Sequence, residues 1–152
     1  MKTSSFRRSH AGSALLEFGI SFGVLMSVFI GTFQWGWTFY QYNVLKSAVN
    51  SGARYASLRP YDSTSTTPSQ GFQDAVKNMV VYGDPTGGTK PVVGGLATKN
   101  VDISVTFTNG VPSSVTISIS GYKIQSVFAS TTLNSKPKVT YVYQGIYSPF
   151  VG

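Results

Sequence analysis

The sequence has no cysteine, a single histidine and few charged residues of either sign. The absence of cysteine excludes disulfide scaffolds, cysteine-based zinc sites and thiol catalysis. The one histidine is His10, which lies in a basic N-terminal stretch. Only 11% of the residues are charged, whereas a soluble domain usually has about 25%. This deficit indicates a membrane-bound, filamentous or secreted protein.

Acidic residues are scarce as well, and their spacing offers no close carboxylate pair. The chain has five of them: Glu17, Asp62, Asp74, Asp84 and Asp102. Acid–base catalysis and oxygen-ligand metal sites both need such groups to converge. The sequence therefore predicts a protein that is not an enzyme, with no catalytic residue, no metal site and no cofactor.

The positive charge is unevenly distributed. Lys2, Arg7 and Arg8 stand within the first twelve residues and supply three of the seven net positive charges. The other nine Lys and Arg residues are scattered over the remaining 140 residues. Because a nucleic-acid-binding surface needs basic residues clustered on one folded face, we expect no nucleic-acid partner.

The longest uncharged stretch runs from Phe18 to Leu45, which is 28 residues. As a helix it would extend about 42 Å, and a bilayer core of about 30 Å needs about 20 residues. Basic residues precede it, so the positive-inside rule predicts one span in membrane lipid with a cytoplasmic N terminus. Its second half carries the aromatic residues typical of a membrane–water interface: Phe33, Trp35, Trp37, Phe39, Tyr40 and Tyr42.

A secretory signal peptide is the alternative interpretation of this stretch. Such a peptide has an apolar core of about 7–15 residues, followed by a small-residue cleavage site. The stretch here is longer, and no such site follows until Ala53 or later, beyond Lys46. The sequence therefore favours a retained membrane helix.

Glu17 stands at the edge of the apolar stretch, where a carboxylate is costly. Snorkelling to the interface is the simpler explanation. If the chain were cut after Gly12, however, the new α-ammonium group of Ser13 would lie four residues before Glu17, on the same helix face. Each charge could then neutralise the other, or the same group on a neighbouring helix.

These features together resemble a type IV prepilin, and specifically the TadE-like pseudopilins of the tight-adherence (Tad) pilus system. Three features carry the resemblance: a basic leader ending at Gly12, Glu17 at the start of an apolar helix, and a small-residue helix exit around Arg54. Major pilins have Tyr where this chain has Phe18, and they are little more than a helix. About a hundred residues follow the apolar stretch here, which favours a minor pseudopilin.

The resemblance implies cleavage between Gly12 and Ser13 by a prepilin peptidase, with Glu17 neutralising charge during assembly. The partners would be other pilin subunits and the pilus assembly platform, and the product would join or prime an adhesive extracellular filament. The implied organisation is a leader over residues 1–12, a transmembrane and filament helix over 13–58, and an extracytoplasmic α+β domain over 59–152. A permanently anchored extracytoplasmic binding module is the alternative function.

Small residues recur every four positions along the apolar helix, forming what we call the small-residue stripe: Gly19, Gly23, Ser27 and Gly31. Such a stripe lets helices approach closely in apolar surroundings, although glycine is also simply common in membrane helices. Gly19, Ser21 and Gly23 also match the nucleophile-elbow pattern. That motif needs a strand-to-helix turn and a histidine partner, so we expect no catalysis there.

The rest of the chain predicts a small α+β domain. The first helix is expected to continue to Leu58 and to stop before Pro60. A short amphipathic helix is predicted from Phe72 to Val80, ending at Gly83, with loops over 63–69 and 84–96. Two adjacent rows of the first helix are predicted to face a partner element: Val44, Ala48, Ser51 and Tyr55, and beside them Leu45, Val49, Gly52 and Ala56.

Alternating apolar residues predict three antiparallel strands, over 101–107, 115–119 and 139–143, with a turn at Asn109-Gly110. Ile124, Val127 and Phe128 are spaced as in one helical turn. Arg54 is expected to be either a solvated charge or paired with Asp62, Asp74 or a neighbouring subunit.

Overall fold

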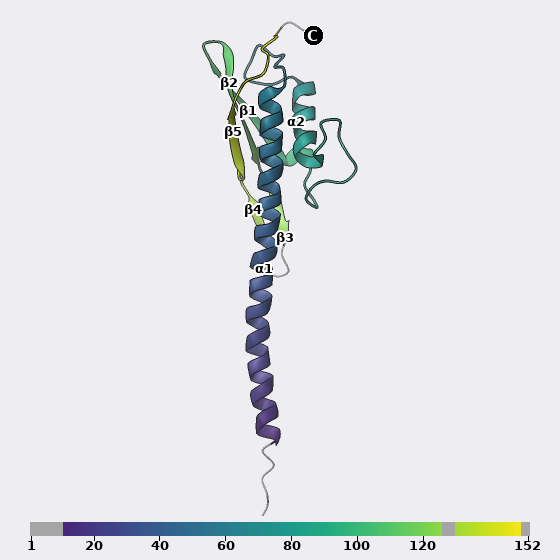
Figure 1. The fold of residues 1–152 in the computed structure, drawn as a ribbon, viewed down its shortest axis with the longest axis vertical. Coiled ribbons are helices and arrows are strands. Elements are labelled where there is room, and N and C mark those ends of the chain that lie inside the picture. Colours follow the sequence, from purple (N-terminus) through teal and green to yellow (C-terminus); the bar gives the residue numbers. More distant parts are fainter. Residues whose placement is uncertain (1–10, 126–129, 150–152) are drawn as a thin grey trace, which may run out of the picture. The chain divides into compact units, whose positions relative to one another are not determined.

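The computed structural model describes residues 11–125 and 130–149, so most of the expected leader lies outside the described residues. It confirms the α+β class, with a long apolar N-terminal helix, a short second helix and a three-stranded antiparallel sheet (Figure 1). The chain forms two compact units, residues up to Trp37 and residues from Thr38 onward. The elements are α1 (Ala11–Leu58), α2 (Gln70–Tyr82), a 3-10 turn η1 (Thr98–Asn100), β1 (Val101–Thr108), β2 (Val111–Ile119), β3 (Tyr122–Gln125), β4 (Ser130–Leu133) and β5 (Lys138–Val142).

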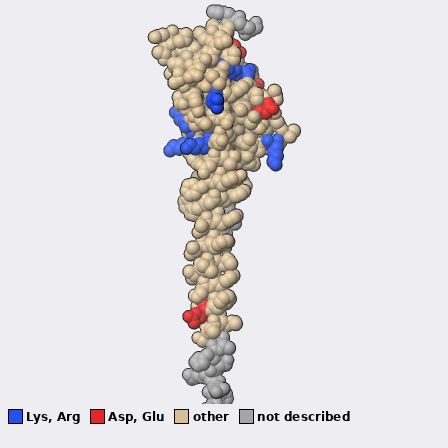
Figure 2. Space-filling model, viewed as in Figure 1, with Lys and Arg blue, Asp and Glu red and all other residues tan. Residues whose placement is uncertain are grey.

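The first unit consists of the apolar part of α1. By length and composition this helix can cross a membrane, with a mean hydropathy of 1.9 and none of its most apolar window buried within the chain. Lys and Arg side chains lie over the α+β unit and are absent from the visible surface of the apolar helix, as Figure 2 shows. Among the described residues this helix is the one candidate for a membrane span, which is consistent with single-pass anchoring.

Both helices of the second unit end where the sequence predicts. α1 stops at Leu58 because the residue before a proline disfavours helical geometry. The Ser69 hydroxyl accepts a hydrogen bond from the Phe72 N–H at 3.2 Å and caps the start of α2. Gly83 ends α2 with φ +76°, and its N–H donates to the Met79 carbonyl.

The sheet has the strand order β1-β2-β5, and every pairing is antiparallel. The register places Ile103 opposite Ile117 and Ile117 opposite Val139, so the alternating apolar residues share one face. The three predicted strands are confirmed, but some ends differ: β2 begins at Val111, four residues before Val115, and β5 ends at Val142, one residue before Tyr143. The other face carries hydroxyl side chains, such as the hydrogen-bonded pair Thr116 and Thr140.

A second sheet, formed by β3 and β4, corrects the helical turn predicted near Ile124. Ile124 lies in β3, is 2% exposed and pairs with Thr131. Tyr122 and Ile124 are buried whereas Lys123 and Gln125 are exposed, which is the period of a strand. Val127 and Phe128, the other residues of the predicted turn, lie outside the described residues. Three apolar positions were too few to distinguish the 3.6-residue period of a helix from the two-residue period of a strand.

The core forms where the last third of α1 packs against α2 and the sheet (Figure 1). One row of α1 supplies fully buried side chains, Leu45, Val49 and Ala56, whereas Val44, Ala48 and Tyr55 of the neighbouring row are only partly buried. Gly52 is also buried, and a Cβ atom there would overlap Val80 Cγ2 of α2. The row from Leu45 to Ala56 is therefore the face of α1 that the domain covers.

An aromatic cluster closes the end of the domain where α1 meets the loop to α2. Tyr61 is fully buried, and its ring centroid lies 5.4 Å from Phe72 and 5.7 Å from Phe107. Its hydroxyl donates to the Ser65 carbonyl at 2.7 Å, and burial raises the pKa of Tyr61 to about 12. The C-terminal segment joins this cluster, because the Ser148 N–H donates to the Tyr61 carbonyl.

Candidate functional site

The segment from Gly12 to Glu17 forms the first turns of α1, and its side chains are exposed. Ser13 and Glu17 are one helical turn apart and therefore lie on the same face. Gly12 lies within the helix rather than in the extended form that a protease cleft binds. A glycine in the first helical turn is readily unwound, because it disfavours helix by about 1 kcal/mol relative to alanine.

Glu17 has no basic neighbour along its own helix. No Lys or Arg occurs between Arg8 and Lys46, and every residue from Phe18 to Leu45 is uncharged. The Glu17 side chain is exposed within the isolated chain. Between residues 11 and 45 the sequence therefore supplies no side chain that could give this carboxylate a positive partner.

The small-residue stripe forms an open strip on the apolar part of α1. A Cβ atom added at Gly19, Gly23 or Gly31 would meet no atom outside the local helix within 4 Å. The Ser27 hydroxyl donates to the Gly23 carbonyl at 2.9 Å, so its hydrogen-bonding need is met inside the helix. The stripe therefore offers another helix a shallow surface with no unsatisfied polar group of its own.

We expect Gly23→Leu to lower the amount of the protein in purified filaments at least about tenfold, which corresponds to about 1.4 kcal/mol. A leucine there would hold a packed helix away from the stripe. The matched control is Val24→Leu, which adds bulk at the next, exposed position. Immunoblotting of membrane and pilus fractions measures both variants. Equal incorporation of the two would show that the stripe is ordinary membrane glycine.

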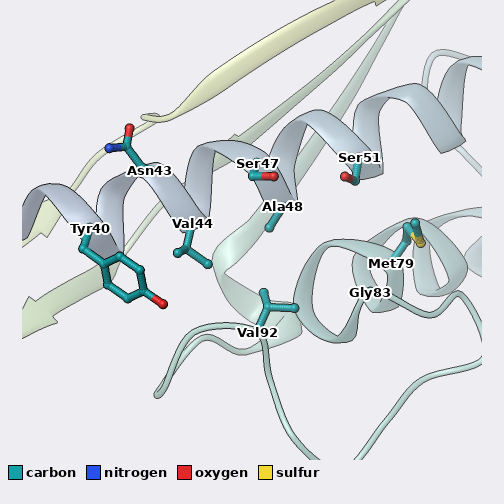
Figure 3. Close-up of a pocket in the computed structure, with 9 residues that line it drawn as sticks. All are labelled: Tyr40, Asn43, Val44, Ser47, Ala48, Ser51, Met79, Gly83 and Val92. Carbon is teal, nitrogen blue, oxygen red and sulfur yellow. The ribbon is translucent and has the colours of Figure 1, made fainter.

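A groove in the second unit lies between α1 and the end of α2, with a volume of about 490 Å³ (Figure 3). One wall belongs to α1 and the other to Met79 and Gly83 of α2 and to Val92 of the following loop. We call this hollow the α1–α2 groove, and its α1 wall consists of Tyr40, Asn43, Val44, Ser47, Ala48 and Ser51. The predicted row through Val44, Ala48 and Ser51 therefore lines an open groove.

A second hollow adjoins this groove along α1, shares Asn43 and Ser47 with it, and reaches Val139 of β5. It has a volume of about 330 Å³, and Lys46, Asn50 and Val139 contribute to its lining. The Asn50 side-chain oxygen accepts a hydrogen bond from the Tyr141 hydroxyl at 3.0 Å. The two hollows differ in charge, because the α1–α2 groove has only uncharged lining residues whereas this one includes Lys46.

Arg54 lies on the exposed side of α1. The two acids proposed as its partners are engaged by neutral donors: the Ser69 hydroxyl donates to Asp62 and the Gln70 amide to Asp74, each at 2.8 Å. The solvated-charge interpretation of Arg54 is therefore favoured within one chain. Over residues 11–125 and 130–149, no three His, Asp or Glu side chains are grouped as a metal ion would need.

Comparison with known proteins identifies the N-terminal part of the chain. A family model described as TadE-like protein matches residues 12–54. The matched range begins at Gly12 and includes Glu17, the small-residue stripe and Arg54. No curated protein and no solved structure matches the chain significantly. Residues 12–54 are therefore similar to TadE-like proteins, a family of pilin-like proteins associated with Tad pili.

Proposed function

We propose that this chain is a minor pilin, or pseudopilin, of a Tad pilus. A prepilin peptidase cuts it after Gly12, and the product is incorporated into the adhesive filament or primes its assembly. The observation that carries this proposal is the TadE-like match, which starts at Gly12 and follows α1 to Arg54. The TadE-like family is a structural one, so we assign the chain no enzymatic role.

In this proposal α1 has two successive environments. Before assembly, its uncharged stretch lies in the bacterial inner membrane with the N terminus in the cytoplasm, and the α+β unit lies outside. During assembly the helix leaves lipid for a protein environment, where unpaired charges are costly. The Ser13 ammonium group and the Glu17 carboxylate would then neutralise one another, within one helix or between neighbouring subunits.

Cleavage separates this function from a permanently anchored binding module, because only a pilin needs a new N terminus at Ser13. We expect intact-mass measurement of the membrane-extracted protein to give a chain that starts at Ser13. Gly12→Leu should leave almost all of the protein uncut, since a bulky side chain at the cleavage position would block entry to a protease cleft. Gly19→Leu makes the same change seven residues beyond the cut and should be processed normally. A mature wild-type protein that still begins at Met1 would contradict the pilin function.

A further inference from the structure

We propose that the α1–α2 groove receives the apolar helix of a second copy of this chain, along its small-residue stripe. The inference rests on the proposed filament function and names the surface by which one subunit holds the next. Its two halves come from different units of the chain: the groove from the unit after Thr38, and the helix from the unit before it.

The groove lies beside a close contact between α1 and α2. Because Gly52 has no side chain, Val80 of α2 packs directly against the α1 backbone there. The neighbouring residues Ser51 and Met79 line the groove beside this contact. Figure 3 shows Tyr40, Val44 and Ala48 projecting from α1 on the side of Val92 and the end of α2, whereas Asn43 projects away. Val92 is 42% exposed although its N–H is fixed to the Val81 carbonyl at 2.8 Å. The apolar wall is therefore held in place, and none of the described residues fully covers Val92.

The chemistry of the lining selects an uncharged, apolar occupant. All nine lining residues are uncharged, and the apolar ones come from both walls, with Val44 and Ala48 facing Met79 and Val92. A charged segment would lose hydration there without gaining a partner. The neighbouring hollow beside β5, which includes Lys46, lacks this selectivity.

The same chain carries the complementary segment. Along the first unit the large apolar side chains are exposed, including Phe18 at 69% and Leu25 at 65%. Lipid covers them in the membrane, and another protein surface must cover them once the subunit leaves it. Because the segment has no charge between Phe18 and Leu45, it meets the requirement that the groove imposes.

The two surfaces also match in length and in period. From Gly19 to Gly31 the stripe covers about 18 Å of helix, and from Tyr40 to Ser51 the groove wall covers about 16 Å. Asn43, Ser47 and Ser51 recur every four residues, as the stripe does. Rows of this period interdigitate when two helices cross, and small side chains on both rows allow close approach.

Disulfide crosslinking tests the contact, and the chain has no native cysteine to interfere. Two differently tagged full-length copies, one with Gly23→Cys and the other with Ser51→Cys, are expressed together in cells that assemble pili. After oxidation we expect a crosslinked species that carries both tags. The matched control replaces Ser51→Cys with Lys46→Cys, which lies on the same helix but lines the other hollow and should crosslink at least about fivefold less.

The outcomes separate this inference from the function on which it rests. Absence of wild-type protein from the pilus fraction would refute the pilin function itself. With wild-type protein present, no crosslink at Ser51, equal crosslinking at Lys46, or a Ser51 crosslink only to a different protein would overturn the docking inference.

Introducing a charge into the groove provides an independent test. Ser51→Glu should reduce incorporation more than about tenfold, whereas Ser104→Glu, on the exposed face of β1, should reduce it less than about twofold. Normal incorporation of a folded Ser51→Glu protein would also overturn the docking inference.

Discussion

Replacing Glu17 with alanine should leave cleavage after Gly12 intact and remove the protein from the pilus. The cut lies five residues before Glu17, so the peptidase still meets its cleavage position. On the proposed pilin function, assembly should fail because the Ser13 ammonium group would enter the filament interior with no carboxylate to neutralise it. Removing one partner of a buried ion pair costs about 3–5 kcal/mol, so the filament content should fall at least about 100-fold.

The measurement is the abundance of the protein in the pilus fraction of a strain in which the processed form is still seen on a gel. Glu17→Gln is the matched variant, because it keeps the length and polarity of the side chain and removes only the charge. It should fail nearly as severely as Glu17→Ala. Normal incorporation of a processed Glu17→Gln protein would show that the carboxylate does not act through its charge.

Replacing Gly52 with leucine should destabilise the folded α+β unit by up to about 2 kcal/mol. The first carbon of any side chain at this position would overlap Val80 Cγ2, and it would lie 3.7 Å from Ile117 Cδ1. Val80 cannot turn aside easily, because it is fully buried and a β-branched side chain in a helix has one preferred rotamer. Overpacking of this kind costs about 1–3 kcal/mol or more, against a helix-propensity gain of about 1 kcal/mol.

The free energy of unfolding of the full chain in detergent micelles, followed by tyrosine circular dichroism, measures this effect. Gly71→Leu is the matched control, because Gly71 is exposed near the start of α2 and a Cβ atom there would meet nothing within 4 Å. It should be neutral or slightly stabilising. Adding Val80→Ala to Gly52→Leu should recover part of the loss. Equal effects of leucine at positions 52 and 71 would show that α1 and α2 do not approach as described.

The sequence was sufficient to predict those structural elements that depend only on residues close together in the chain. The uncharged stretch from Phe18 to Leu45 requires only composition and length to indicate a membrane helix. Pro60 and Gly83 mark helix ends through the conformations of single residues, and the structure places the two ends where they predict. Strict alternation through Val101 and Ile117 predicted β1 and β2, because a strand with one buried face repeats every two residues.

The similarity of the N-terminal segment to TadE-like proteins could also be predicted from the sequence, since it depends on residues close together in the chain. Gly12, Glu17 and the following apolar helix predicted the relationship that the family match over residues 12–54 confirms. Cleavage at Gly12 and the role of Glu17 remain predictions, because they concern reactions with other molecules rather than the fold of this one.

Only the tertiary structure decided which row of α1 is buried and what the other row does. The row through Val44 and the adjacent row through Leu45 both carry small or apolar residues. The sequence alone therefore could not show which of the two rows is the more deeply buried. The position of α2 and the sheet buries the Leu45 row and leaves Val44 beside an open groove. The groove is lined by residues from three separate parts of the sequence, 40–51, 79–83 and 92. No periodic pattern in the sequence links these parts, because only the packing of α1, α2 and the following loop brings them together.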